Sequence, residues 1–293
     1  MKKALIKYTG YIIYAILVTV GLLYYRFPSE ALQSHLVRMA GRMDPAIIFS
    51  TQSLEPSFPP GLRLQEPIFS LEEHPETPFF KARHLSVSPG MGSLILGNTT
   101  WFFDAQAYGG IISGHIQSGE DGKMDAFSLS LKNVRLHEYA FLPHFGVGDF
   151  AGNLKGNITY NGPPDRIVQG EGAGDIFISE GKIDLINPLL GLETIPFGQL
   201  NVRFTLKKGT INLTSVSLDG KGFQGSLSGT IRLNRIMNRS RLNLRGTIEP
   251  NAAFLETLKG GPALLSLFGG GRKDSKRSFV IQGTFRSPKF RFT

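Results

Sequence analysis

One short pattern recurs from residue 112 to the end of this 293-residue chain and restricts its fold more than any other feature. The pattern is an aliphatic residue, any residue, Gly, any residue and an apolar residue. Its five copies centre on Gly114, Gly156, Gly229, Gly246 and Gly283. Apolar residues at every second position lie on one face of a β-strand, and the positions between them lie on the other face. The pattern therefore predicts a series of antiparallel strands with one apolar and one polar face.

The apolar positions of these strands define a candidate groove or core face. Each glycine of the pattern is two residues away from an aliphatic residue, so we expect the glycines on the same face as the aliphatic side chains. A Gly there leaves room or allows the strand to bend. Two interpretations stay open: a curved sheet whose apolar trough admits acyl chains, or a closed core in which aromatic rings cover the glycines. The candidate residues are Ile112, Leu154, Ile158, Ile183, Leu185, Ile211, Leu213, Leu227, Ile231, Leu244, Ile248, Ile281 and Phe285.

An uncharged apolar run extends from Tyr8 to Tyr25. As a helix it covers roughly 27 Å, close to the hydrocarbon thickness of a bilayer. Lysines at 2, 3 and 7 precede it. The positive-inside tendency then places residues 1–7 in the cytoplasm and the rest of the chain beyond the membrane. The alternative is a cleaved signal peptide, but the run is long and no small-x-small cleavage site follows it. We therefore expect a single-pass transmembrane helix at 8–25.

The segment behind this anchor, residues 26–44, has the pattern of an amphipathic helix. Ser29 can cap its start, and Leu32, Leu36 and Met39 recur at helical spacing. Residues 45–293 are then expected to form one β-rich domain, as a grooved or sandwich-like antiparallel sheet.

Further elements are expected inside this β-rich domain from local composition. Strands are predicted at 47–49 and 79–87, and short helices at 136–145, 186–192 and 251–268. A glycine-rich and then basic segment at 269–278 is predicted to be an exposed loop.

The composition argues against several classes of function. The chain has no Cys, which removes disulfides, thiol nucleophiles and zinc-thiolate sites. Its net charge is +9, with a basic cluster at 272–277, but it has no nucleic-acid motif, so nucleic acid is not an expected partner. The nearest approach to a histidine cluster, His137, Glu138 and His144, lacks the spacing of a zinc protease. We therefore expect neither an enzyme nor a metal or cofactor site.

The end of the chain resembles a known family. Residues 280–290 contain the motif Gly-x-Phe-x-x-Pro-x-Phe at Gly283, Phe285, Pro288 and Phe290, which is similar to the C-terminal repeats of AsmA-like proteins. The chain length and the helix behind the anchor resemble most the type II secretion system protein N family in its delta-proteobacterial form.

This resemblance implies an inner-membrane protein with a cytoplasmic N-terminus and a periplasmic β-rich body. In type II secretion it would be a non-enzymatic accessory component, whose partners are the inner membrane and other type II secretion components. The AsmA-like side implies an alternative: a lipid-binding or lipid-transfer protein whose apolar β-groove shields acyl chains between the inner and outer membranes, with phospholipid as its partner. Neither family brings a catalytic residue with it. A closed core favours the first function and an open trough favours the second.

Overall fold

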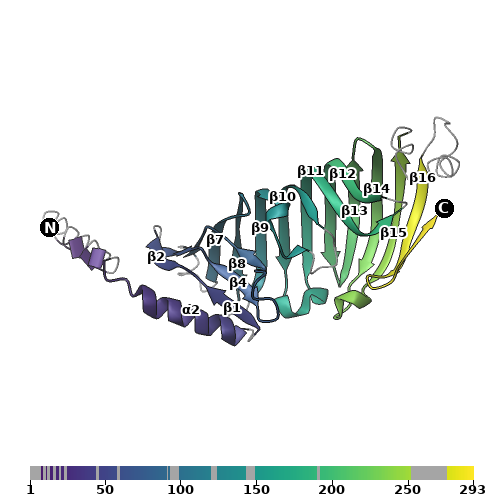
Figure 1. Cartoon of the computed structure of the whole chain (residues 1–293). Helices are drawn as coiled ribbons and strands as arrows, with labels where there is room; N and C mark the ends of the chain where they lie inside the picture. Colours follow the sequence, from purple (N-terminus) through teal and green to yellow (C-terminus); the bar gives the residue numbers. More distant parts are fainter. Residues whose placement is uncertain are drawn as a thin grey trace.

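The computed structural model is dominated by one antiparallel sheet of 14 strands, with a three-stranded sheet and a helix at one end (Figure 1). The strands of the large sheet follow one another in chain order, apart from β4 and β5, which belong to the small sheet. The structure describes residues 8, 11, 14–15, 18–19, 21–22, 25–43, 46–57, 60–90, 92, 99–119, 124–142, 149–189, 192–251 and 276–293.

The elements alternate between long strands and short connections. Helix α2 spans Ser29–Met43, and the small sheet consists of β1 (Ile47–Ser50), β4 (Ile68–Leu71) and β5 (Phe80–Lys81). The large sheet consists of β2 (Ser53–Ser57), β3 (Gly61–Gln65), β6 (His84–Pro89), β7 (Thr99–Ala107), β8 (Gly110–Ser118), β9 (Met124–Arg135), β10 (Phe150–Asn161), β11 (Glu171–Leu189), β12 (Leu192–Lys207), β13 (Thr210–Asp219), β14 (Phe223–Arg232), β15 (Arg241–Pro250), β16 (Arg277–Thr284) and β17 (Pro288–Phe292). Three 3₁₀-helices are described: η1 (Leu136–Glu138), η3 (Pro164–Gln169) and η4 (Met237–Arg239).

The period-two pattern of the sequence becomes an alternation of side chains, which β-bulges interrupt in places. Along β14, exposed residues alternate with buried or half-buried ones, from buried Phe223 to exposed Arg232. The registers keep each kind of residue on its own face, since Ile231 pairs with Ile211 on one side and Leu242 on the other. All five copies of the glycine pattern lie in strands, although Phe285 falls one residue beyond β16. The predicted mainly β, antiparallel architecture is confirmed.

Helix α2 packs on the body of the protein. Its bounds fall within the predicted range 26–44. Leu32 and Leu36 contact a cluster of buried residues from β1, β2 and β3, and the Gln33 side chain donates a hydrogen bond to the carbonyl oxygen of Thr51 at 2.9 Å. Most of the predicted anchor, 8–25, lies outside the described residues. Among the residues that are described, no helix is both long and apolar enough to cross a membrane.

Two local predictions are wrong. The helical turn expected at 186–192 is not formed, because β11 continues to Leu189, which pairs with Leu192 of β12 and closes a long hairpin. The single strand expected at 79–87 is divided between the two sheets. Its break falls where the Ala82 N–H donates to the Pro67 carbonyl oxygen and the Arg83 N–H to that of Gln106.

Three further expectations are met in part or lie outside the described residues. The helix expected at 136–145 is reduced to η1, and residues 143–145 are not described. Residues 252–268 and the loop residues 269–275 also lie outside the described part, whereas Arg277 and Ser278 belong to β16 and not to a loop.

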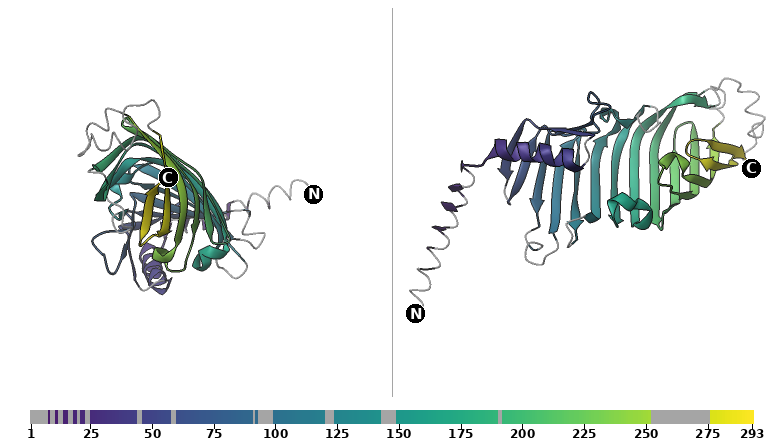
Figure 2. Two further views of the ribbon diagram at one scale, coloured as in Figure 1. Left: turned by 90° about the vertical axis from the view of Figure 1, so that its right-hand side faces the viewer. Right: turned by 90° about the horizontal axis from the view of Figure 1, so that it is seen from below.

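The large sheet is curved and open. Seen end-on, in the left view of Figure 2, its strands bend into an arch. From β13 to β16, each strand has its extensive contacts only with the strands beside it, and no helix or second sheet among the described residues stacks on them. Over β13 to β16 the described strands therefore do not form a sandwich of two stacked sheets.

Candidate functional site: the apolar face of the large sheet

One unbroken apolar row crosses the large sheet. Successive cross-strand partners at one level are apolar residues or glycines in all 14 strands, with no polar interruption. The row is Pro56, Leu62, Val87, Phe103, Gly114, Leu129, Ile158, Gly174, Phe204, Leu213, Gly229, Leu244, Ile281 and Phe290. At about 4.8 Å between neighbouring strands, this row is roughly 62 Å long.

The neighbouring row on the opposite face is polar over most of its length. Arg63, Ser86 and Asp104 are successive partners at its start, and Asp175 and Arg203 are partners near the middle. The two faces of the large sheet therefore differ in chemistry from one end to the other.

Residues of the apolar row are only half-buried along most of the sheet. Most of its large side chains fall between buried and exposed, and Phe290 on the edge strand is 47% exposed. Contiguous exposed apolar surface of this extent marks a binding site for a ligand, a membrane or another protein. The apolar face is therefore the candidate site.

A small apolar hollow of about 220 Å³ lies on this face over β9 to β12. Phe127, Ile158 and Phe204 of the sheet line it, together with Ile167 of η3. Tyr160 also lines it, and its hydroxyl donates a hydrogen bond to the Pro163 carbonyl oxygen at 2.9 Å. The hollow is smaller than sites that enclose a whole small ligand. It therefore suits one part of a longer apolar chain.

The glycines of this face do not form empty slots. Phenylalanine rings lie against four of them from the neighbouring strand, so that a Cβ on the glycine would meet the ring. The pairs are Gly114–Phe103, Gly174–Phe204, Gly181–Phe197 and Gly246–Phe279, each in direct cross-strand register. Aromatic rings therefore cover Gly114 and Gly246, two of the five glycines of the sequence pattern, as one of the two interpretations predicts. The apolar face is smooth where these rings lie.

The structure places most of the predicted site residues on this one face. Leu244 is buried at 6% exposure, Phe285 is exposed at 43%, and the side chain of Leu185 lies outside the described part. The half-buried ones are Ile112, Leu154, Ile158, Ile183, Ile211, Leu213, Leu227, Ile231, Ile248 and Ile281. Cross-strand register brings some of them together directly, such as Leu244 with Ile281.

Sequence reasoning missed the residues that line the apolar hollow, with the exception of Ile158. Phe127, Tyr160 and Phe204 lie on the same face but outside the glycine pattern. The available signal was the alternation itself, since Val202, Phe204 and Leu206 are separated by polar or charged residues.

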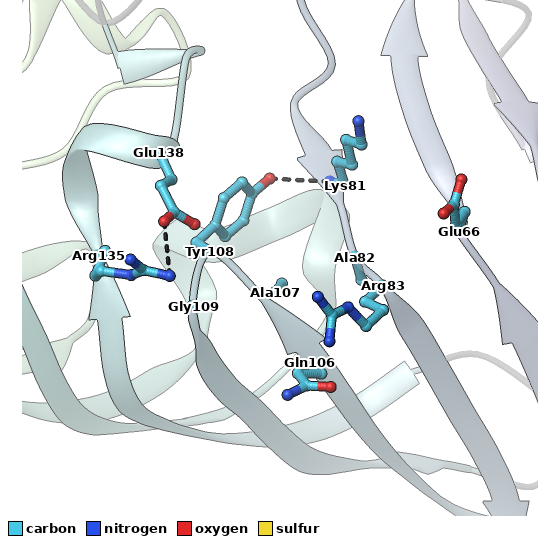
Figure 3. A pocket seen from close by; sticks show the side chains of 10 residues that line it. All are labelled: Glu66, Lys81, Ala82, Arg83, Gln106, Ala107, Tyr108, Gly109, Arg135 and Glu138. Carbon is cyan, nitrogen blue, oxygen red and sulfur yellow. Dashed lines mark hydrogen bonds and ion pairs between the residues drawn. The ribbon is translucent and has the colours of Figure 1, made fainter.

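A second hollow of about 620 Å³ is polar and lies where the small sheet meets the large one (Figure 3). The two-residue turn between β7 and β8 has positive φ at Tyr108 and Gly109, 51° and 67°, and places the Tyr108 ring at this junction. The Tyr108 hydroxyl accepts a hydrogen bond from the Lys81 backbone N–H at 2.9 Å, and Arg135 pairs with Glu138 at 2.8 Å. Burial raises the pKa of Tyr108 to about 12, so its hydroxyl stays protonated at neutral pH. These contacts hold the junction together.

The described side chains contain no candidate metal site. Among them, no three His, Asp or Glu residues lie close enough together to hold a metal ion, and His144 is not described. The expectations that the chain is not an enzyme and carries no cofactor stay predictions.

Comparison with protein-family models, with curated proteins and with solved structures finds no match to this chain. The fold and the site by themselves define a class: a long, single antiparallel sheet with one continuous apolar face. Membership of the AsmA-like or secretion family stays a prediction from the sequence.

Proposed function

We propose that the chain binds phospholipid acyl chains along the apolar face of its large sheet. The observation that carries this proposal is the unbroken apolar row across all 14 strands, half-buried along most of its length. A ligand that covers such a row must be apolar, long and flexible. An acyl chain has these properties, and each CH₂ group that it buries contributes about 0.8 kcal/mol.

The smoothness of the face favours an acyl chain over a specific protein segment. Protein partners bind through a few anchor side chains in fitted pockets. Here rings lie over Gly114, Gly174 and Gly246 and fill the places where such anchors would insert. The apolar hollow of about 220 Å³ opens on the same face. Hydrocarbon needs no hydrogen-bond partner, so a smooth apolar floor suffices for it.

The test uses the absence of Cys in the chain. A fluorophore is attached to a single introduced cysteine in the full chain, at Leu227→Cys in one variant and at Ser228→Cys in the other. These neighbours lie on opposite faces, with Leu227 half-buried and Ser228 exposed. Phosphatidylglycerol with brominated acyl chains should quench the label at position 227 and leave the label at 228 unchanged. Equal quenching at both positions, or none at 227, contradicts the proposal.

A second proposal, an accessory role in type II secretion from the inner membrane, has support from the chain length and from helix α2 behind the predicted anchor, the two features that resemble the secretion family. The motif that resembles AsmA-like proteins forms the closing hairpin, in which Gly283 pairs with Pro288 at the start of β17. Gly283 has a positive φ of +102°, and a Cβ at this position would meet the Ser287 carbonyl oxygen, so this turn of the hairpin requires glycine. Deletion of the gene should then reduce the export of folded proteins into the medium. Unchanged export after deletion contradicts this role and leaves acyl-chain binding untouched.

A further inference from the structure

The positive charge of this protein is concentrated at one end. Residues 1–226 contain 19 Lys and Arg against 20 Asp and Glu, whereas residues 227–293 contain 13 against 3. The net charge of +9 therefore comes from the C-terminal part of the chain. The single cluster noted at 272–277 is only a portion of it, and this uneven distribution can be read directly from the sequence.

Two connections meet at the C-terminal end of the sheet and gather five arginines. The β14–β15 connection contains η4, and the β16–β17 turn is bonded to it: the Phe285 N–H donates to the Ser240 carbonyl oxygen at 3.2 Å, and the Arg286 N–H to that of Asn238 at 3.1 Å. We call this region, with its five arginines, the basic corner. Its arginines are Arg232, Arg235, Arg239, Arg241 and Arg286.

The charges of the basic corner are not neutralised by the described part of the chain. None of its five arginines forms an ion pair with a described carboxylate, and Arg232 lies directly across from Arg241. Like charges in direct cross-strand register destabilise a sheet. On β11 and β12 the opposite holds, since Arg203 pairs with Asp175 at 3.0 Å. The basic corner is therefore arranged for an external anion and not for the stability of the sheet.

Large apolar side chains are exposed among these arginines. Ile236 is 53% exposed, Met237 57% and Phe285 43%. Several backbone groups of the connection are bonded within the protein: the Ile236 N–H donates to Asn234 Oδ1 at 3.0 Å, and the Asn234 N–H to Oγ of fully buried Ser240 at 3.1 Å. A turn whose polar groups are already bonded can bring apolar side chains to a lipid surface without leaving those groups unsatisfied.

We propose that the basic corner docks on the surface of a bilayer that contains anionic phospholipid. Ile236 and Met237 enter the headgroup layer, and the surrounding arginines bind lipid phosphates, as in other apolar surfaces that bind membranes through flanking cations. The corner lies at the end of the sheet opposite helix α2 (Figure 1). This docking goes beyond acyl-chain binding and does not depend on it.

The test measures the capture of vesicles by the full chain, kept soluble in amphipol and held on beads through its N-terminus. The vesicles are phosphatidylcholine alone, or phosphatidylcholine with one third phosphatidylglycerol. The wild type should capture only the anionic vesicles. Raising the salt from about 0.1 M to about 1 M shortens the screening length from about 10 Å to about 3 Å and should weaken capture.

Two variants divide the contributions of the basic corner. The triple substitution Arg235→Gln, Arg239→Gln and Arg286→Gln should weaken capture roughly 100-fold, since each cation near an anionic surface contributes a factor of about five. The double substitution Ile236→Ser and Met237→Ser should weaken it about tenfold or more.

Matched controls remove similar side chains elsewhere. The triple control is Lys132→Gln, Lys155→Gln and Lys221→Gln, all exposed residues outside the basic corner, and the apolar control is Ile111→Ser, 44% exposed on β8. Both should capture vesicles as the wild type does.

The outcomes are distinct. Failure of the wild type to capture anionic vesicles overturns the proposal and points to an acidic protein surface instead. Equal losses in the controls and the corner variants also overturn it. Thermal unfolding by circular dichroism identifies a variant that has failed to fold, and a single substitution, Arg286→Gln, then replaces it with an expected loss of about fivefold. Quenching at Leu227→Cys reports on acyl-chain binding alone, so either proposal can fail without the other.

Discussion

The two ends of the large sheet follow the same strand pattern but bury it differently. At the N-terminal end, α2 and the small sheet cover the apolar face, and Leu54 and Leu64 are only 2% and 5% exposed. At the C-terminal end the described residues place no layer over the face, and Phe290 and Phe292 on β17 are 47% and 40% exposed. Alternation in the sequence thus decides which face is apolar, while burial varies along that face: Leu242 and Leu244 on β15 are still 8% and 6% exposed, and the rings of the edge strand β17 are the exposed ones.

The covered end is an ordinary two-layer core. Phe27, Leu32 and Leu36 pack against the buried residues of β1 to β3, and the rings of Phe49 and Phe69 lie 4.7 Å apart. Folded domains normally bury each apolar face in this way. A second buried cluster, with Leu136 of η1, Ile178 and Phe197, lies near the middle of the sheet. Many other apolar side chains of the large sheet are only half-buried, and the proposals of lipid binding account for their partial exposure.

The largest expected effect is a charge placed in the covered end. Leu64→Asp should lower the free energy of unfolding by about 4 kcal/mol, because the carboxylate is buried without a partner. Leu227→Asp on the half-buried stretch should cost only about 1 kcal/mol, because water can reach the charge. Denaturant unfolding measures both, and hydrogen exchange shows which strands open, since a long sheet can unfold in parts. Equal losses would mean that the two ends do not differ in cover.

A smaller effect is expected from the glycine–phenylalanine pairs of the uncovered stretch. A Cβ at Gly246 would run into the Phe279 ring and the Ser226 carbonyl oxygen, so Gly246→Val should cost about 2 kcal/mol. Gly225 is the matched control, because its Cβ would meet only the Thr247 carbonyl oxygen at 3.6 Å, an ordinary contact. Gly225→Val should therefore change stability by no more than about 0.5 kcal/mol. If thermal unfolding shows the same loss for both, the ring contacts do not restrict the face.

The smallest effect is expected at the junction between the two regions. The pKa of Tyr108 is raised by burial from 10.0 to about 12, so the folded state disfavours the phenolate. The stability that the neutral phenol contributes is complete below pH 10 and is lost as the pH rises through about 12. Its size is about 1 kcal/mol after allowance for the partial exposure of the ring. Unfolding measured from pH 9 to 12 should show this loss in the wild type and a shallower slope in Tyr108→Phe. An unchanged slope in the variant would assign the loss to other groups.

Much of the fold could be predicted from the sequence, because alternation is a local property. The glycine pattern correctly placed five strands, and helical spacing placed α2. The strand expected at 47–49 is confirmed as β1, but its pairing into a small sheet with β4 and β5 was missed because these strands are short: β5 has only two residues. The turn expected at 186–192 was wrong because a leucine-rich run with an early proline fits either a helix or a paired strand, and the pairing of β11 with β12 decided it.

The candidate site could be predicted only in part. The alternation of apolar and polar residues placed most of the thirteen candidate residues on one face of the sheet. The same alternation fits a closed sandwich, so only the arrangement of the sheets in the structure shows that the face is open. Phe204 and Tyr160 were missed because they lie outside the glycine pattern. The basic corner depends on two hydrogen-bonded connections that are far apart in sequence, and local composition does not reveal such a contact. The family, the secretion role and the membrane location stay predictions.

The nearly sequential order of the strands has a consequence for how such a molecule changes over evolutionary time. Each strand bonds chiefly to the strand before it and the strand after it. Duplication or deletion of a hairpin therefore alters only the strand pairings on its two sides. Every added hairpin lengthens the sheet by about 10 Å. The length of the sheet is therefore set by the number of hairpins. It can be adjusted to a required distance without changing the sequence of either end.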